Sequence, residues 1–371
     1  MDHPDVSGLA GGEELMLPYW VLFALTAWIA INSQRGVLSS RRWSTLWQIF
    51  FLLLVLMIGL RHNVGGDWGS YFKKLESLRY LSLERVISKE SIEIGYSLMN
   101  LMAIDTGLDI YFVNFCCSII FAWGLIEFSR AQPRPWLAVV VAVPYLVIVV
   151  AMGYTRQGAA IGFGMLGMVA LTNSKLFRFM LFVALAASFH KSAVLLVPLA
   201  ALSNPRSKVW NISWALVFSV LFYSVFLESS VETLQRSYLE ARYMSAGAAI
   251  RVWMNAVPAV LFFSFRARFA LKSDRLFWTS MAALALFFVV LLQVSSSSTA
   301  IDRVGLYLIP LQLFVLSRLP EVFGKSNGNN QIFVLGVVFY SALVQFVWLF
   351  FAVNVNYWLP YQFYPLFLLL Q

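Results

Sequence analysis

The sequence contains little charge for its length. Of its 371 residues only 12% are Asp, Glu, Lys or Arg, whereas a soluble domain carries about 25%. Hydrophobic residue types make up 60% of the chain, so too few polar side chains are present to cover a water-facing surface. The composition therefore excludes a soluble globular, disordered or fibrous protein. It predicts a chain whose main solvent is the lipid bilayer.

Residues for metal binding and cross-linking are also scarce. The chain has three histidines and two cysteines. Cys116 and Cys117 are adjacent within an apolar run, which suits neither a disulfide framework nor a zinc site. No phosphate-binding loop, nucleotide fingerprint or Gly-x-Ser-x-Gly elbow is present in the sequence. We therefore expect no metal and no cofactor, and neither nucleotide hydrolysis nor serine-hydrolase chemistry.

The apolar residues fall into repeated runs of about 15 to 20 residues, and they lack the alternation of an outer-membrane barrel strand. We predict an all-α, polytopic bundle of about 12 transmembrane helices (range about 10–14) that forms a single membrane domain over residues 1–371. The predicted spans are Leu17–Ile31, Leu46–Leu60, Ile110–Ile126, Trp136–Met152, Gly158–Thr172, Phe179–Phe189, Lys191–Leu202, Trp210–Leu227, Ile250–Phe265, Leu276–Val294, Val304–Ser317 and Gln331–Val353. Phe179–Phe189 and Lys191–Leu202 are too short to cross alone without distortion, so they could instead form a broken or re-entrant pair around His190.

Lysine and arginine concentrate in alternate loops, which predicts the orientation of the chain. If the basic loop after the first span is cytoplasmic, the N-terminus lies outside and the other basic loops fall on the cytoplasmic side. The net charge of +9 is then a topology signal, and nucleic-acid binding is not needed to explain it. We interpret Ser91–Ile104 as a surface-lying or re-entrant segment, because counting it as a span would invert every later loop.

Most other polar residues fall on the predicted outer face, in segments 61–109 and 228–249. The first segment begins with Arg61 and continues through Gly65-Gly66-Asp67-Trp68 to Tyr71. Paired glycines allow a tight turn with exposed amides, Arg61 offers a fork for phosphate, and Asp67 could accept a proton. The alternative is an arginine that reaches the lipid headgroups beside an ordinary turn.

A second candidate is Arg156-Gln157, at the start of a predicted span. A helix N-terminus favours an anion over a cation, so Arg156 and the free amides together would form a phosphate seat. Arg156 could equally be an arginine that extends to the membrane interface.

The third and fourth candidates are His190-Lys191 and Arg303 with Tyr307. A histidine and a lysine at a break between apolar runs are costly unless they are solvated or paired. A single histidine is often structural, and Arg303 could simply be solvated by the adjacent Asp302. Together, outward-facing arginines, one histidine and few acids suit an anionic lipid-linked substrate, for which pyrophosphate is the natural match.

These elements resemble the EpsG-like and Wzy-like polymerases of bacterial exopolysaccharide, capsule and O-antigen. The resemblance covers most of the chain, in an order that starts at Arg61, Gly65-Gly66-Asp67-Trp68 and Tyr71. It continues with Glu93-Ile94-Gly95-Tyr96, Arg156-Gln157, Phe189-His190-Lys191-Ser192-Ala193, Arg303 and Tyr307. The segment 228–249 matches no part of the family pattern.

The resemblance implies a GT-C-like, metal-independent membrane glycosyltransferase in the bacterial cytoplasmic (inner) membrane. Such proteins join undecaprenyl-pyrophosphate-linked oligosaccharide repeat units on the periplasmic or outer face during surface polysaccharide biosynthesis. A flippase and a chain-length regulator are the partners that the resemblance implies. No nucleic acid is expected.

The resemblance also suggests roles for individual residues. Arg61, Arg156 and Arg303 would hold the donor pyrophosphate, and His190 would assist the leaving group or orient the acceptor. Asp67 is the first candidate for the general base and Glu93 the second. Gln157, Tyr71 and Tyr307 would complete the pyrophosphate and sugar site.

Other functions remain open from the sequence. An O-antigen ligase of the same compartment would usually have one dominant outer loop, and 228–249 is only moderately long. A flippase or transporter for lipid-linked sugars would distribute charge through the membrane depth and show related halves. A membrane O-acyltransferase would need a donor site with access from the cytoplasm.

Overall fold

A computed structural model of the chain describes residues 9–33, 43–81, 93–202, 247–271, 274–294, 298–325 and 330–369, together with 213, 216–217 and 220. Most of the predicted span Trp210–Leu227 and most of the outer segment 228–249 lie outside the described residues.

Helices occur in each of the other predicted spans. The main helices are α1 (Leu9–Asn32), α2 (Thr45–Gly59), α6 (Asp109–Arg130), α7 (Pro135–Ala142), α8 (Thr155–Thr172), α9 (Leu176–Phe189), α12 (Ala248–Ser264), α13 (Arg275–Val294), α15 (Ile309–Leu316) and α17 (Gln331–Phe351). Shorter helices are α3 (Trp68–Leu78), α5 (Ile94–Thr106), α14 (Ser298–Gly305), α16 (Leu319–Phe323) and α18 (Tyr364–Leu369). The remaining turns are the π-helix η1 (Val143–Ala151) and the 3₁₀ segments η2 (Lys191–Leu202), η7 (Arg266–Phe269), η8 (Leu306–Leu308) and η9 (Val355–Tyr357).

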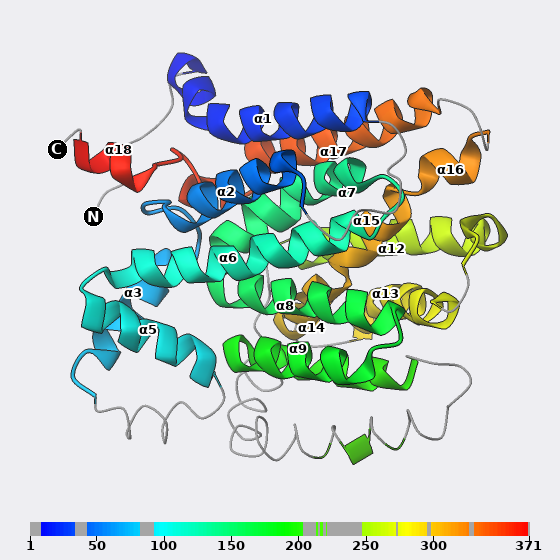
Figure 1. The fold of residues 1–371 in the computed structure, drawn as a ribbon. Helices are drawn as coiled ribbons and strands as arrows, with labels where there is room; N and C mark the ends of the chain where they lie inside the picture. The colour runs from blue at the N-terminus through cyan, green and yellow to red at the C-terminus, as the bar shows by residue number, and fades with distance from the viewer. Residues whose placement is uncertain are drawn as a thin grey trace.

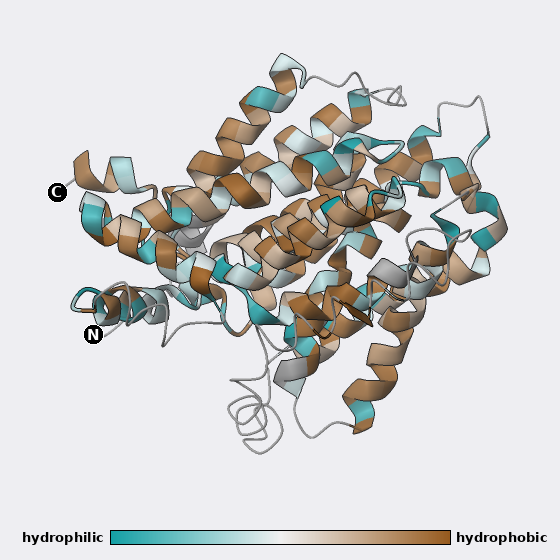
Figure 2. Cartoon of the chain, turned by 60° about the horizontal axis from the view of Figure 1, so that its bottom comes forward, coloured by the Kyte–Doolittle hydropathy of each residue, from teal (hydrophilic) through white to brown (hydrophobic). Residues whose placement is uncertain are grey.

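The long helices are apolar, as a membrane protein requires. Within the described residues, four segments are long and apolar enough to cross a membrane: α6, α13, α17 and the run Ile301–Phe323. Figure 2 shows hydrophobic colour along the lengths of the helices, with most hydrophilic residues towards their ends and in the connections. The prediction of a helical membrane protein is therefore confirmed. The number of about 12 spans and the GT-C-like architecture stay predictions.

Glycines allow the central helices to approach one another closely. A Cβ atom added at Gly162 in α8 would lie 2.7 Å from the Cα atom of Phe121 in α6. On the other side of α6, a Cβ atom at Gly59 would lie 2.7 Å from the Ser118 hydroxyl. Small residues provide close backbone packing in membranes, where lipid is as apolar as a side chain. In Figure 1, α2, α6, α8 and α9 lie side by side in one layer. Gly59 and Gly162 allow α2 and α8 to pack closely against α6 in this layer.

The connections that we predicted to be cytoplasmic gather at one end of the bundle. The Trp43 indole donates to Glu127 at 2.5 Å, and Arg134 forms an ion pair with Glu321 at 2.7 Å. The Gln331 amide donates to the Ile31 carbonyl at 3.0 Å. Helices that alternate in direction therefore bring these distant segments together, as the charge pattern predicts. The side of the membrane on which this end lies stays a prediction.

The short helices α3 and α5 lie together at the opposite end (Figure 1). α5 has 13 residues, which at 1.5 Å per residue is about 20 Å and too short to cross a hydrocarbon core of about 30 Å. The described part of Ser91–Ile104 is thus a helix that packs at this end and does not invert the later helices.

The two short apolar runs form a pair that breaks at His190. α9 ends there because His190 is extended (φ −150°, ψ 117°), and η2 continues as a 3₁₀ helix that packs against α9. The chain therefore reverses at His190, which agrees with the broken pair expected from the lengths of the runs.

The close approach of α6 and α8 gives a test of the packing. We expect Gly162→Ala to destabilise the protein by about 1–3 kcal/mol, because the new methyl group would overlap backbone atoms that cannot move aside. Gly336→Ala in α17 is the matched control, since no atom lies within 4 Å of its added Cβ. Thermal unfolding of the detergent-solubilised protein measures both, and equal melting temperatures would contradict the packing described for α6 and α8.

Candidate functional site

The polar end of the bundle brings together five segments that are far apart in the sequence. They are the turn before α3, the start of α5, the first turn of α8, the junction between α9 and η2, and α14 with η8. Four contacts join them: Arg156 with Glu93, Arg156 over the ring of Tyr71, Gln157 with the Arg303 carbonyl, and Ser192 with Tyr307. We call Asp67, Tyr71, Glu93, Arg156, Gln157, His190, Arg303 and Tyr307 the polar cluster.

Arg156 is the central cation of the polar cluster. Its guanidinium forms an ion pair with Glu93 and lies over the rings of Tyr71 and Tyr96, with its Cζ atom 5.4 Å and 5.6 Å from their centroids. Its Nε–H is buried and has no hydrogen-bond partner within the described structure. A buried donor without an acceptor is rare, so this atom is available to an oxygen of a ligand.

Asp67 precedes α3, and its carboxylate accepts a hydrogen bond of 3.4 Å from the Tyr71 hydroxyl. Burial raises the pKa of Asp67 above its ordinary value, although nearby Arg156 and Arg303 and the bond from Tyr71 oppose this rise. A carboxylate with a raised pKa is a better proton acceptor than an exposed one. The environment of Asp67 therefore suits the predicted base. For Glu93, the second candidate, the ion pair with Arg156 occupies one carboxylate oxygen.

His190 is linked to Tyr307 through the Ser192 hydroxyl. Its Nδ1 atom is 2.6 Å from the Ser192 hydroxyl, which in turn is 3.5 Å from the Tyr307 hydroxyl. Burial lowers the pKa of His190, and the positive charges of Arg156, Arg303 and Lys191 lower it further. The imidazole is therefore neutral at physiological pH and can accept or donate a single proton.

Arg303 is positioned through its neighbours on α14. Its carbonyl oxygen accepts a hydrogen bond of 2.5 Å from the Gln157 amide. The adjacent Asp302 forms a two-pronged ion pair with Arg251 of α12. The side chain of Arg303 is exposed, yet it is close enough to influence the pKa of both Asp67 and His190. Arg303 thus presents its charge to the polar cluster from the side of α14.

Arg61 is the one predicted site residue that the structure does not bring into the polar cluster. It is only 1% exposed, and its guanidinium donates to the carbonyls of Val64 and Ile58 and to the Thr155 hydroxyl. The side chain of Arg61 is therefore held inside the protein, next to Thr155 at the N-terminus of α8. The contact of Arg61 with pyrophosphate stays a prediction, and this geometry favours a structural role in which Arg61 connects the end of α2 to the start of α8.

The sequence analysis missed the contribution of the C-terminal segment. The Gly65 amide donates to the Tyr357 carbonyl at 2.7 Å, and the His62 amide donates to the Gln362 carbonyl at 2.9 Å. The Trp358 indole lies against Gly153, where an added Cβ would collide with the ring, and donates to the Ile148 carbonyl at 2.8 Å. Gly65 itself has φ +111°, a conformation that favours glycine. Nothing local to 352–369 marks it as a support for the turn before Asp67.

The described residues contain no group of three His, Cys, Asp or Glu side chains arranged to hold a metal ion. The polar cluster instead combines Asp67, Glu93 and His190 with the cations Arg156 and Arg303. This arrangement suits an anion that carries several charges together with a group that gives up a proton.

The fold and the polar cluster define a helical membrane protein with an arginine-containing polar site at one end of its bundle. The chain belongs to the EpsG family, whose model matches residues 44–363. Comparison with curated proteins and with solved structures gave no significant match. The resemblance drawn from the motifs is therefore confirmed at the level of the family, and it supports a role in polysaccharide biosynthesis at a membrane.

The buried position of Arg61 gives a test that separates support from substrate contact. We expect Arg61→Lys to lower the stability of the protein by about 3 kcal/mol, because one ammonium cannot replace the fork and leaves buried acceptors unsatisfied. Arg79→Lys, at an exposed ion pair with Glu76 and Asp109 on the same end, is the matched control and should leave the melting temperature unchanged. A wild-type melting temperature for Arg61→Lys would rule out this structural role of Arg61.

Proposed function

We propose that this protein is a glycosyltransferase that polymerises undecaprenyl-pyrophosphate-linked oligosaccharide repeat units at the outer face of the bacterial cytoplasmic membrane. The observation that carries the proposal is the polar cluster itself, in which Arg156 and Arg303 lie near a half-buried carboxylate, Asp67, and a neutral histidine at one end of an apolar bundle. Membership of the EpsG family supports the same class of reaction.

The reaction transfers the growing glycan from one lipid carrier to a new repeat unit. The bond between the anomeric carbon of the reducing-end sugar and the pyrophosphate oxygen breaks, and undecaprenyl pyrophosphate leaves with the electron pair. A hydroxyl oxygen of the incoming lipid-linked unit forms the new bond to that carbon. The hydroxyl proton passes to the base.

Arg156 and Arg303 would bind the pyrophosphate and stabilise its charge as the bond breaks. Cations that are already in position give this stabilisation without rearrangement in the transition state. The buried Nε–H of Arg156 provides a donor for a phosphate oxygen. Gln157 holds the carbonyl of Arg303 and so sets the distance between the two cations.

Asp67 would accept the proton of the acceptor hydroxyl, and its raised pKa supports this role. His190, neutral and linked through Ser192 to Tyr307, would orient the acceptor or assist the leaving group. Pyrophosphate is a good leaving group, so positioning and charge stabilisation would supply most of the acceleration.

The orientation of the chain is part of the proposal. The end that carries Arg134, Arg318 and Lys325 would face the cytoplasm by the positive-inside rule, which places the polar cluster and the N-terminus outside. A flippase would then deliver the substrate to this face, and a chain-length regulator would act on the product.

The cations are the first target for a test of this function. We expect Arg156→Ala to reduce polymer formation from lipid-linked repeat units in proteoliposomes by about 100-fold or more, because a charge that stabilises the leaving group is lost. Arg303→Ala should act in the same direction. Arg178→Ala, an exposed arginine at the opposite end, is the control for charge removal. Wild-type chain lengths from correctly inserted Arg156→Ala protein would exclude this arginine from the site, and transfer of finished polymer to lipid A core would indicate a ligase.

The pH dependence of the reaction tests Asp67. The pKa of Asp67 is raised, so its carboxylate becomes protonated at a pH above the ordinary aspartate pKa of about 3.9. We expect the wild-type rate to fall as the pH falls through that value. Asp67→Asn should lower the rate by about 10²–10⁴-fold and abolish this acid limb. Asp109→Asn, at an exposed carboxylate on the same end, should keep both the rate and the limb. An unchanged acid limb in Asp67→Asn would assign the base to another residue.

A further inference from the structure

An apolar groove of about 470 Å³ lies directly beside the polar cluster. Its walls come from η2, α13 and the run through α14 and η8, and they include Leu195, Leu199, Leu284, Phe288 and Leu308. Every lining side chain is apolar except that of Tyr307, a member of the polar cluster. The groove therefore begins where the polar site ends.

Tyr307 connects the groove to the histidine of the polar cluster. The Tyr307 hydroxyl lies 3.5 Å from the Ser192 hydroxyl, which contacts His190, so one residue joins the groove to the histidine. Ile301 and Val304 line the groove from one face of α14, whereas Arg303, two residues after Ile301, lies on a different face of that helix. A ligand that contacts His190 could thus extend an apolar chain past Tyr307 onto these walls.

The rim of the groove is accessible from the outside of the bundle. Leu195 is 55% exposed and Leu284 is 38% exposed, although both line the groove. Exposed leucines on a helix as apolar as α13 face lipid in a membrane protein. An apolar chain can therefore enter sideways from the bilayer without crossing the polar end.

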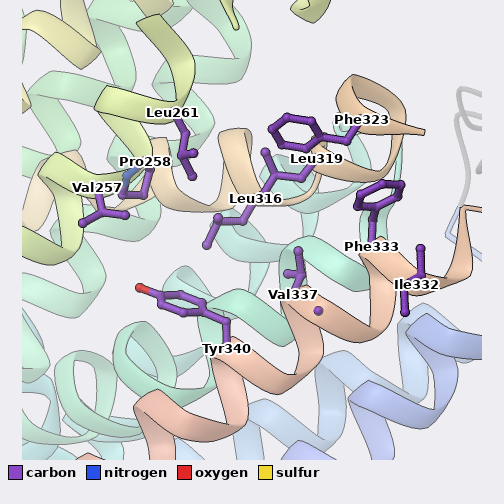
Figure 3. A pocket seen from close by; sticks show the side chains of 11 residues that line it. Val257, Pro258, Leu261, Leu316, Leu319, Phe323, Ile332, Phe333, Val337 and Tyr340 are labelled. Atoms are coloured by element: carbon purple, nitrogen blue, oxygen red, sulfur yellow. The ribbon is translucent and has the colours of Figure 1, made fainter. Parts of the chain in front are cut away.

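A second apolar groove, shown in Figure 3, lacks this connection. It has a volume of about 510 Å³ and lies between α12, the end of α15 with α16, and the start of α17. Ile332 and Phe333 line it, next to the end of the bundle at which the predicted cytoplasmic connections gather. Both grooves suit lipid chains by composition, but only the first shares a residue with the polar cluster.

We propose that the groove between η2, α13 and α14 holds the part of the polyisoprenoid chain nearest to the pyrophosphate of the donor. This inference rests on the proposed function, since it assigns the tail of the same lipid-linked substrate. Arg156 and Arg303 would hold the pyrophosphate at the polar cluster, and the tail would pass Tyr307 to lie along Leu195, Leu284 and Leu308. Burial of hydrocarbon there would hold the anomeric carbon in place beside Asp67.

Binding of two probes separates the tail from the headgroup. The full-length protein in nanodiscs is titrated with undecaprenyl pyrophosphate and, separately, with inorganic pyrophosphate. We expect Leu284→Trp, which fills the groove, to weaken binding of undecaprenyl pyrophosphate by about tenfold or more and to leave inorganic pyrophosphate unaffected. Ile332→Trp in the second groove is the matched control and should change neither. Equal affinity of wild-type and Leu284→Trp protein for undecaprenyl pyrophosphate would overturn the proposal.

Photo-crosslinking avoids any dependence on the folding of the Trp variant. Undecaprenyl pyrophosphate with a diazirine close to its pyrophosphate is irradiated with the wild-type protein, and the modified peptides are identified by mass spectrometry. Crosslinks in η2 and α13 that excess undecaprenyl pyrophosphate removes, but excess phosphatidylglycerol does not, support the proposal. Crosslinks at the second groove overturn it, as does equal competition by phosphatidylglycerol, which would indicate a site for bulk lipid.

Polymerisation is measured in parallel so that the two proposals can fail separately. A protein that polymerises repeat units but crosslinks outside η2 and α13 would retain the proposed function and overturn the tail site. A protein that crosslinks in the groove but forms no polymer from lipid-linked units would support the tail site and overturn the proposed reaction.

Discussion

Three consecutive side chains in the first turn of α8 join three separate segments of the chain. Thr155 accepts from Arg61 at 2.7 Å, Arg156 pairs with Glu93, and Gln157 donates to the Arg303 carbonyl. Successive residues of a helix point about 100° apart, so one turn can reach in three directions. The position of this turn therefore sets the relative positions of the turn before α3, the start of α5, and α14. The contacts of Glu93 and Arg303 within the polar cluster depend on it.

The close backbone contacts around α8 explain why the first turn of this helix has a fixed position. Gly162 brings α8 against α6, and Gly59 brings α2 against the other side of α6. Arg61 follows directly after α2, so the close packing of α2, α6 and α8 also sets the distance over which it reaches Thr155. The C-terminal segment completes the support, because Trp358 fills the space beside Gly153. Packing in the apolar part of the bundle thus determines the geometry of its polar end.

Charges are few in this chain, and two ion pairs lie in or beside the polar cluster. Asp302 binds Arg251 and does not merely solvate the adjacent Arg303, which was one reading of the sequence. Arg156 forms an ion pair with Glu93, and its guanidinium lies over the rings of Tyr71 and Tyr96. In surroundings of low dielectric constant each such pair acts strongly on its neighbours. Burial raises the pKa of Asp67 against the opposing effect of Arg156 and Arg303, and burial together with these cations lowers the pKa of His190. Both directions suit proton transfer without a net charge on the histidine.

The sequence by itself determined that the chain is a helical membrane protein, where most of its helices lie, and which polar residues belong to one end. Scarce charge, long apolar runs and alternating basic loops are local properties, and they survive in the fold. Only the tertiary structure separated Arg61 from Arg156, because both read as arginines at a membrane interface until their acceptors are known. It also decided that residues 352–369 support the turn before Asp67 and that an apolar groove begins at Tyr307. These features arise from contacts between segments hundreds of residues apart, and no spacing within a single segment encodes them.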